Sequence, residues 1–465
     1  MATPIPKNRA SFELSELESV GRLVGPSRRI VGITSDSRSI APGELFVALR
    51  GESFDGHRFA SAAIAAGAAA LLVSDASVVP EGASAIIASD TLAALGEIAR
   101  IHRRRWSKTV VGITGSAGKT TTKELVRAAL AATGLDVHAT RGNLNNRVGV
   151  PMTIFELEDH HDVAVIEMGT SEAGEIRTLA SIAEPDVAVI TSIGLSHAAG
   201  IGSVDDVARE KGALFEAIHA DGAVVVNLDD DRVASLSLPL HRRVVRYGTS
   251  HDADVRLSDI AIEASGATAV VHTRNQSLSV RLAIPSRVAL LNAAAAISVA
   301  SILGRNEAEA ALGLATAGTI EGRMHPIELG SGVLVVDDAY NANPKSMVAA
   351  LESCAALAAS RGGRLVVALG EMRELGEHAR DAHVALGHAV VSSHAARMIA
   401  VGDAMEDAVR VVAQAGIETV LVADSVAAAA AVGSLRPNDV VLVKGSRSIR
   451  MERVVEALVA SEASS

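Results

Sequence analysis

Cysteine and aromatic residues are scarce in this sequence. Its 465 residues include a single cysteine, Cys354, which excludes an internal disulfide framework and a cysteine-rich metal site. Cys354 lies in an alanine-rich helical stretch, and we interpret it as a buried structural residue. Because the chain has only one Trp, two Tyr and six Phe, it offers few rings on which unpaired bases could stack. This scarcity argues against single-stranded nucleic acid as a ligand.

A basic excess and long apolar runs are also missing. The formal net charge is −11, whereas proteins that bind nucleic acid or anionic membranes usually present a basic face. No stretch of about 18 residues is apolar throughout, as a membrane-spanning helix requires, and the first residues lack the apolar core of a secretory signal. We therefore expect a cytoplasmic protein that is not inserted in a membrane and binds no nucleic acid.

The length and the order of apolar segments predict three domains of the α/β class. A chain of 465 residues with 49% hydrophobic side chains is too long for one core. Residues 1–107 combine short strand-like runs with an alanine-rich helix, which indicates a small mixed α/β domain. In residues 108–320 apolar strands alternate with helices, as in a parallel-sheet P-loop ATPase domain, and residues 252–284 change to an antiparallel pattern. Residues 321–465 repeat the strand–helix alternation, which predicts a Rossmann-like doubly wound domain.

The strongest chemical signal is the segment TVVGITGSAGKTTTKEL, in which a strand leads through a glycine-rich turn into a helix. Such a loop directs backbone N–H groups and a helix N-terminus at phosphates. Lys119 is then placed to reach the terminal phosphates, and the Thr120 hydroxyl to bind Mg²⁺. The segment departs from the usual consensus at Ile113, where glycine is expected. We predict a nucleotide-phosphate site formed by Gly115, Ser116, Ala117, Gly118, Lys119, Thr120 and Thr121.

Further polar residues follow predicted strands or lie on the helices after them, near the strand ends where open α/β sheets bind ligands. Glu167 in DVAVIEMG is suited to a Mg²⁺ ion held by nucleotide phosphates, although a strand-end glutamate is structural equally often. His197 in TSIGLSH is by itself more typical of packing or hydrogen bonding, since Mg²⁺ prefers oxygen. Lys211 in VAREKGALFE has the pattern of a helix-surface lysine paired with glutamates. The adjacent Asp337 and Asp338 in DDAYNANPKSM favour a ligand role.

In their order along the chain, these segments resemble the Mur ligase family over essentially the whole sequence. GSAGKTT resembles the ATP loop of that family, RGNLNNRVGVP its substrate-facing segment and EMGTSEAGEI its metal-binding segment. LGEMRELG and VLVKGSRSIRME resemble segments of its last domain. VDDAYNANPKSM resembles the members that add D-alanyl-D-alanine to UDP-N-acetylmuramoyl-tripeptide, because Asn341 and Asn343 occupy a turn where relatives that add diaminopimelate or lysine tend to carry a His.

The resemblance implies roles at the nucleotide end of a site. Lys119 and Thr120 would bind the phosphates of ATP and Mg²⁺, of which two ions are expected. Glu167 and His197 would be further metal ligands, and Lys211 would be carbamylated, which turns it into a carboxylate-like group that would join them at the metal site. The implied nucleotide contacts also include Asn292, Arg323, Asp338 and Asn341. The implied catalytic set is Lys119, Lys211, Arg323 and His197.

The resemblance also implies a substrate-binding surface. SDSRSIAPGELFVALRGESFDGH resembles a uridine-nucleotide module, so that the uridine end of the substrate would contact Ser37, Arg38, Asp55, Gly56 and His57. The UDP-sugar peptide would face Asn143, Asn145 and Asn146. One departure from the family follows His197, where Ala198, Ala199 and Ile201 replace bulkier residues.

The implied reaction is ATP-dependent amide ligation in the synthesis of a peptidoglycan precursor. The tripeptide carboxylate would attack the γ-phosphate of ATP to give an acyl phosphate, and the amine of D-alanyl-D-alanine would then displace phosphate. We expect a monomer whose domains close on ATP. Two alternatives are considered. One is another amide ligase of the superfamily, such as the diaminopimelate- or lysine-adding enzyme or a folylpolyglutamate synthase. The other is a nucleotide-switched binding protein that makes no product.

Overall fold

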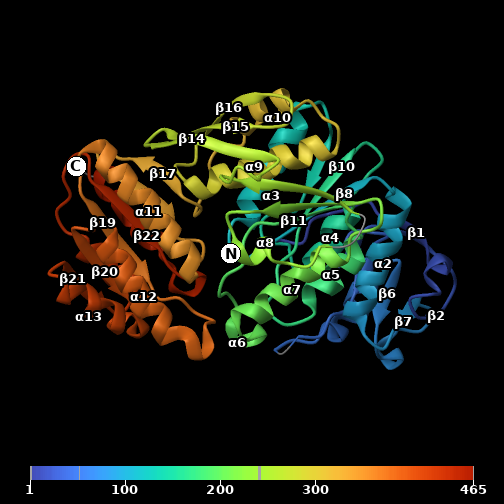
Figure 1. The fold of residues 1–465 in the computed structure, drawn as a ribbon. Coiled ribbons are helices and arrows are strands. Elements are labelled where there is room, and N and C mark those ends of the chain that lie inside the picture. The colour runs from blue at the N-terminus through green and yellow to red at the C-terminus, as the bar shows by residue number, and fades with distance from the viewer. Residues whose placement is uncertain (1–2, 52, 239–241, 464–465) are drawn as a thin grey trace.

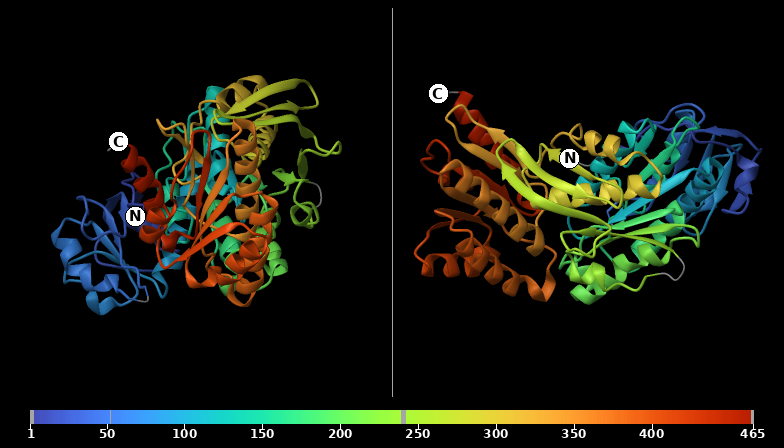
Figure 2. Two further views of the ribbon diagram at one scale, coloured as in Figure 1. Left: turned by 90° about the vertical axis from the view of Figure 1, so that its left-hand side faces the viewer. Right: turned by 45° about the horizontal axis from the view of Figure 1, so that its top comes forward.

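The computed structural model describes residues 3–51, 53–238 and 242–463 and arranges them in three α/β units (Figure 1). The N-terminal unit is blue in Figure 1, the central unit runs from cyan to yellow, and the C-terminal unit is orange to red. The central unit lies between the other two, as the further views in Figure 2 also show. Within the described ranges, no helix is both long enough and apolar enough to cross a membrane.

The N-terminal unit is a small mixed sheet with two helices, α1 (Ala60–Ala65) and α2 (Thr91–Trp106). Its strands lie in the order β2-β7-β6-β5-β4, with β2 antiparallel to its neighbour and the others parallel. Their bounds are Arg22–Val24, Ala85–Ile87, Ala70–Val73, Leu45–Val47 and Ile33–Thr34, and β1 (Ser11–Glu13) pairs separately with β3 (Arg29–Val31). Helix α2 also packs on the central unit, so the two units share one hydrophobic core.

The central sheet has the strand order β16-β15-β14-β13-β12-β11-β8-β10-β9. From β9 to β14 neighbouring strands are parallel, and β14, β15 and β16 are antiparallel to one another, as the alternation in this stretch predicts. The parallel strands are β8 (Thr109–Thr114), β9 (Val137–Ala139), β10 (Val163–Glu167), β11 (Val187–Ile190), β12 (Ala223–Asn227) and β13 (Arg243–Gly248). The antiparallel strands are β14 (Val255–Glu263), β15 (Gly266–His272) and β16 (Ser277–Leu282).

Helices cover both faces of the central sheet, which explains why its parallel strands are apolar almost throughout. One face packs on α3 (Lys119–Ala132), α9 (Arg287–Ile302) and α10 (Glu307–Leu314). The other face packs on α4 (Gly149–Phe155), α5 (Glu175–Ala183) and α7 (Val204–Glu216), and α2 packs on α4 and α5. Two short helices, α6 (Ala198–Ile201) and α8 (Asp231–Ala234), follow strands β11 and β12.

The C-terminal unit is doubly wound. Its strands lie in the order β17-β18-β22-β19-β20-β21, and only the edge strand β17 (His325–Glu328) is antiparallel. The others are β18 (Leu334–Asp338), β19 (Leu365–Gly370), β20 (Arg397–Val401), β21 (Glu418–Val422) and β22 (Val440–Lys444). Helices α11 (Pro344–Arg361), α12 (Ala379–Ser392) and α13 (Glu406–Gln414) cover one face, and α14 (Ser425–Ala431) and α15 (Glu452–Ala463) the other. Cys354 is completely buried on α11.

Candidate active site

A cavity of about 770 Å³ lies where the central and C-terminal units meet. Its walls are the loops that follow β8, β10, β11 and β12 of the central sheet, and those that follow β18, β19 and β22 of the C-terminal sheet. These are the carboxyl ends of parallel strands, which is where open α/β sheets bind ligands because the loops diverge there. Two sheets therefore direct their strand ends into one cavity.

The loop between β8 and α3 forms the floor of this cavity, which all of residues 116–121 line. Gly115 has φ 152°, and a Cβ atom there would lie 1.9 Å from the Thr191 hydroxyl oxygen, so a larger residue would not fit. Gly118 has φ 84° and caps α3, and a Cβ there would lie 3.0 Å from Asn292 Nδ2. The first N–H groups of α3 lack acceptors within the helix. The loop and helix are thus shaped to bind an anion.

Lys119 extends back over this loop. Its Nζ donates a hydrogen bond to the Gly115 carbonyl at 2.6 Å. Burial lowers the pKa of Lys119, and the negative charge of Glu167 opposes that effect. A bound phosphate would supply the anionic partner that the backbone carbonyl only partly replaces.

Glu167 ends β10 beside the same loop and is 2% exposed. Its Oε1 accepts a hydrogen bond from Asn145 Nδ2 at 2.7 Å. Its Oε2 is buried and has no hydrogen-bond partner among the described residues. Such an orphaned carboxylate oxygen, in a cavity that the Thr120 side chain also lines, fits a hard divalent cation.

His197 joins the central unit to the C-terminal unit. It has a left-handed backbone (φ 52°), and its Nδ1 lies 2.5 Å from Glu374 Oε2. The backbone N–H of Ala199 donates to the Glu374 carbonyl at 3.1 Å, and Gly376 approaches Ala199 closely. Ala199 therefore contacts this loop of the C-terminal unit directly. Burial lowers the pKa of His197, and the carboxylate of Glu374 opposes the shift.

Lys211 is fully buried on α7, whereas the local pattern alone predicted a lysine on the helix surface. Its Nζ forms no hydrogen bond or ion pair with any residue that the structure describes, and it does not line the cavity. Burial and the nearby positive charge of Lys119 hold the pKa of Lys211 well below its usual range. The prediction of an exposed Lys211 was wrong because α7 packs against α5 and the central sheet, and the middle of α7, including Glu210 and Lys211, is buried there.

The C-terminal wall brings several predicted residues to the cavity. The Arg323 guanidinium lies 3.9 Å from the ring centre of Tyr340 and 3.4 Å from the Thr120 hydroxyl, so it reaches across to α3. Asp338 lines the cavity and accepts a hydrogen bond from Lys444 Nζ at 2.5 Å. Asp337 does not line the cavity, because its carboxylate accepts backbone N–H groups of the strand connection beside it. Asn292 and Asn341 also line the cavity.

The predicted substrate residues fall into two groups. Asn143, Asn145 and Asn146 line the cavity. The five predicted residues of the N-terminal unit do not line the cavity: Ser37, Arg38, Asp55, Gly56 and His57. Two of these residues make contacts internal to that unit: the Arg38 guanidinium pairs with Asp36, and the His57 ring lies 2.6 Å from Asp55 and accepts the N–H of Ser74.

Sequence reasoning missed several side chains of the C-terminal wall. They line the cavity and lie at the end of a strand or in the connection and first helical turn after it, in the segments VDDAYNANPKSM, LGEMRELG and VLVKGSRSIRME. These side chains are Tyr340, Lys345, Glu374, Lys444 and Arg447. The signal that could have identified them is their position near the carboxyl ends of predicted strands.

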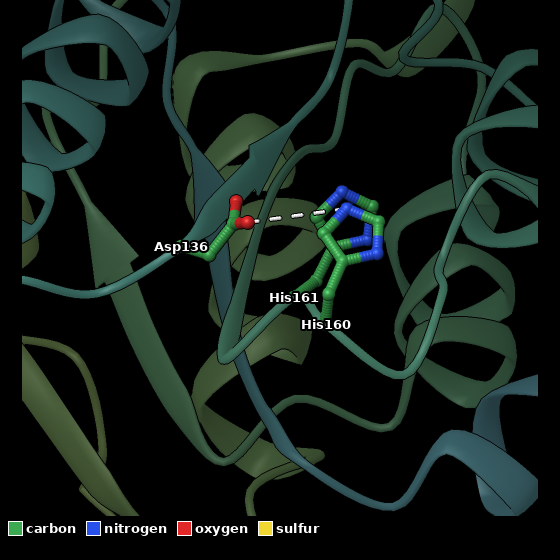
Figure 3. Close-up of side chains that lie close together, drawn as sticks. All are labelled: Asp136, His160 and His161. Carbon is green, nitrogen blue, oxygen red and sulfur yellow. Dashed lines mark ion pairs between the residues drawn. The ribbon is translucent and has the colours of Figure 1, made fainter.

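A second polar cluster precedes β9 and β10 and so lies at the end of the central sheet opposite to the cavity. Figure 3 shows its three side chains close together. Asp136, His160 and His161 place one ligand atom each within 4.8 Å of one another, where β9 and β10 begin. The Nδ1 of His161 accepts the N–H of Glu158 at 3.0 Å, and the His160 and His161 rings are 4.0 Å apart. This cluster lines no part of the cavity, and we do not include it in the candidate site.

Comparisons with known proteins agree over the whole length of the chain. Residues 29–106 match the catalytic domain of the Mur ligase family, residues 113–300 the Mur ligase middle domain, and residues 322–447 the Mur ligase glutamate ligase domain. A curated protein of Escherichia coli (strain K12), named UDP-N-acetylmuramoyl-tripeptide--D-alanyl-D-alanine ligase, is 36% identical over 457 residues, or 96% of this chain and 98% of its own. The protein of the same name from Mycobacterium bovis is 36% identical over 94% of this chain and 93% of its own.

Solved structures show the same architecture. The crystal structure of MurF from Acinetobacter baumannii is 29% identical and covers 98% of this chain and all of its own, with a TM-score of 0.88. The MurF ligase of Thermotoga maritima, solved in complex with ADP, is 28% identical over 93% of this chain and 98% of its own, with a TM-score of 0.83. On these matches and on the arrangement of its three units, the chain belongs to the Mur ligase family.

Proposed function

We propose that the chain is an ATP-dependent ligase that joins D-alanyl-D-alanine to UDP-N-acetylmuramoyl-tripeptide. The products are UDP-N-acetylmuramoyl-pentapeptide, ADP and phosphate. The observation that carries the proposal is the single cavity in which the phosphate loop, Glu167 and the Asn341-to-Asn343 turn meet. The full-length similarity to relatives that bear this activity in their names supports the choice of substrates. We propose cytoplasmic action, and domains at residues 1–107, 108–320 and 321–465.

The proposed reaction needs positioning and charge neutralisation more than a protein nucleophile. An oxygen of the tripeptide carboxylate attacks the γ-phosphorus of ATP, and the bond to ADP breaks. The amine of the dipeptide then attacks the acyl carbon, loses a proton, and expels phosphate. Lys119 contacts the phosphate loop at Gly115 and Arg323 contacts Thr120, so that both charges would stabilise the transferring phosphoryl group.

Mg²⁺ fits the oxygen donors at the end of β10. Thr120 and Glu167 supply oxygen, and His197 lies on the same cavity wall. The orphaned Oε2 of Glu167 supports this assignment, since a buried carboxylate oxygen without a donor is costly unless a cation balances it. When bound, the ions would neutralise charge on the phosphates. We propose these residues as ligands, with room for two ions.

We further propose that Lys211 is carbamylated. In that step its neutral amine attacks CO₂, an N–C bond forms, and one proton is released. The support is that Lys211 is completely buried without a partner among the described residues, and that its lowered pKa favours the neutral amine. The carbamate would place a carboxylate-like group near Lys119, whose charge acts on the Lys211 amine, and near His197, on which the charge of Lys211 acts.

The proposed activity is tested by ADP release from purified protein with ATP, Mg²⁺ and UDP-N-acetylmuramoyl-tripeptide. We expect release to require D-alanyl-D-alanine, and Lys119→Ala to lower it by about 100-fold or more. Mass spectrometry should identify the pentapeptide. Release that requires free diaminopimelate, lysine or glutamate in place of the dipeptide would assign the chain to a neighbouring amide ligase. ATP hydrolysis that is indifferent to both substrates would favour a nucleotide-switched binding protein.

A further inference from the structure

Glu210 is a buried carboxylate to which the proposed reaction gives no role. It lies in the middle of α7 and is 7% exposed. Its Oε2 accepts the backbone N–H of Gly174 at 2.6 Å, and its Oε1 accepts that of Ile176 at 2.7 Å. The Thr170 hydroxyl lies 3.2 Å from the same Oε1. All three partners belong to the segment that directly follows Glu167 in the chain.

These contacts cap helix α5 from a different element. The helix begins at Glu175, and its own N-cap, Gly174 (φ 89°), has no side chain that could accept its N–H groups. The first N–H groups of a helix lack acceptors and attract negative charge. Glu210 supplies both the acceptors and the charge. Because both of its oxygens are engaged by N–H donors, the connection between β10 and α5 is fixed to α7 at this point.

Glu210, which makes these contacts, is the residue directly before Lys211 in the chain. Successive side chains of an α-helix point about 100° apart, so Glu210 can reach α5 while Lys211 extends elsewhere. The Nζ of Lys211 is close enough to Lys119 and His197 for their charges to interact. Since Lys211 has no polar contact of its own within the described chain, its position depends on how α7 is held. A rotation or slide of α7 that displaced Lys211 would break the hydrogen bonds of Glu210.

We infer that Glu210 is a positioning residue, which fixes Lys211 and the segment after Glu167 relative to each other. The inference rests on the proposed function, because it concerns the placement of two groups that would serve the metal site. Glu210 touches no substrate and acts through the two neighbouring residues.

The chain offers a matched control on the same helix. Glu216 also connects α7 to α5, through an exposed ion pair at 2.6 Å with Arg177. Removing it tests whether any link between these helices has the same effect. Glu210→Gln gives a graded variant, because the amide keeps an oxygen that can accept from Ile176 but turns an NH₂ group toward the N–H of Gly174. Glu210→Ala removes both acceptors.

We expect Glu210→Ala to lower kcat about 10- to 100-fold. It should also weaken the ¹³C carbamate signal of protein equilibrated with ¹³C-bicarbonate, a signal that Lys211→Arg assigns. Glu210→Gln should lie between Glu210→Ala and the unchanged protein. Glu216→Ala should stay within about twofold of the unchanged protein, as is typical for an exposed ion pair. Amide hydrogen exchange of residues 168–178 should rise in Glu210→Ala and not in Glu216→Ala.

Two results would overturn the inference: an undiminished carbamate signal and kcat in Glu210→Ala, or equal losses in Glu216→Ala. If Glu210→Ala does not fold by circular dichroism, the same comparison is decided by Glu210→Gln. Unchanged protein that forms neither carbamate nor product would contradict the proposed function, and the inference with it. If the unchanged protein forms both, either of the two overturning results would contradict the inference alone.

Discussion

At the scale of single residues, the part-buried Lys119 on the cavity wall and the fully buried Lys211 differ in their polar contacts. Lys119 donates a hydrogen bond to the Gly115 carbonyl, whereas Lys211, which is 1% exposed, forms no hydrogen bond or ion pair with the described residues. The charge of Lys119 adds to burial in lowering the pKa of Lys211. A buried amine without an anion is costly in its charged form. This electrostatic arrangement favours an anionic ligand at Lys119 and a modification that removes positive charge at Lys211.

The clearest pH effect at this scale is expected from His138 on β9. Burial, with the nearby charges of His161 and Arg141, lowers its pKa from 6.5 to about 4. Below pH 6.5 the unfolded chain binds a proton at this position that the folded chain does not bind. The free energy of unfolding is therefore unaffected by His138 above pH 6.5 and decreases as the pH falls from 6.5 toward 4.

Replacing His138 with glutamine should reduce this acid sensitivity. Denaturant titrations of the unchanged protein at pH 7.5 and pH 5 should differ by about 2 kcal/mol more than those of His138→Gln. His251→Gln is the control, because His251 is an exposed residue of the same unit. Equal pH dependence in His138→Gln and the unchanged protein would mean that the imidazole is not excluded from water as strongly as its burial implies.

The place of a residue could be predicted from the sequence where the local pattern and the final environment agree, and Lys119 and Thr120 do line the cavity. The Lys119 and Thr120 positions follow from the loop sequence, because a strand, a glycine turn and a helix fix their place relative to each other. For Lys211 the local pattern predicted exposure, since Glu210 and Lys211 adjacent to each other are typical of a helix surface. Their burial depends on how α7 packs against α5 and the sheet. The spacing of residues along α7 alone carries no information about that packing.

At the scale of elements, the connection between β8 and α3 depends on two glycines for different reasons. At Gly115 the Thr191 side chain excludes a Cβ atom. At Gly118 the left-handed backbone favours glycine, and the Asn292 amide lies close by. A comparable turn occurs at Gly134, with φ 85°, but a Cβ there would meet no atom within 4 Å. Gly118 and Gly134 therefore have the same left-handed backbone but differ in their surroundings.

This pair permits a controlled test of the loop. Gly118→Ala and Gly134→Ala should each cost about 1–2 kcal/mol of stability from the left-handed backbone. Only Gly118→Ala should also weaken ATP binding, because its Cβ points at Asn292 beside the phosphate loop. Isothermal titration calorimetry with a non-hydrolysable ATP analogue, with thermal unfolding in parallel, separates the two effects. Equal affinities in the two variants would show that the close approach at Gly118 has no influence on nucleotide binding.

Element types and their order were predictable because they depend on local periodicity. The antiparallel stretch was recognised from alternation, yet alternation did not reveal that β14 pairs in parallel with β13 and so extends the central sheet. In the segment that resembles a uridine-nucleotide module, by contrast, local patterns gave no indication of function. Ser37, Arg38 and the turn at Asp55 could be assigned only by resemblance, since their local contacts are ordinary ion pairs and caps.

At the scale of the whole molecule, the C-terminal unit is held against the central unit around the rim of the cavity. Asn343 Nδ2 donates to the Ser116 carbonyl at 3.0 Å, and Lys345 pairs with the buried Asp230. Asp230 also accepts the N–H of Ile193 in the loop after β11. The turn that resembles the dipeptide-adding ligases thus reaches both the phosphate loop and a neighbouring strand end. The contacts that hold the two units together therefore lie beside the residues of the candidate site.

The final prediction concerns the closure of the two units. Lys345→Met removes the ion pair to Asp230 and leaves a buried carboxylate without its cation, so the open arrangement should be favoured. Small-angle scattering of the free variant should give a larger radius of gyration than the unchanged protein, and the KM for ATP should rise about tenfold. Arg380→Met is the control, because its ion pair with Asp407 lies within the C-terminal unit. ATP analogue with the UDP-substrate should reduce the radius of both variants. If Lys345→Met and Arg380→Met scatter alike, the Asp230 pair does not control how the units close.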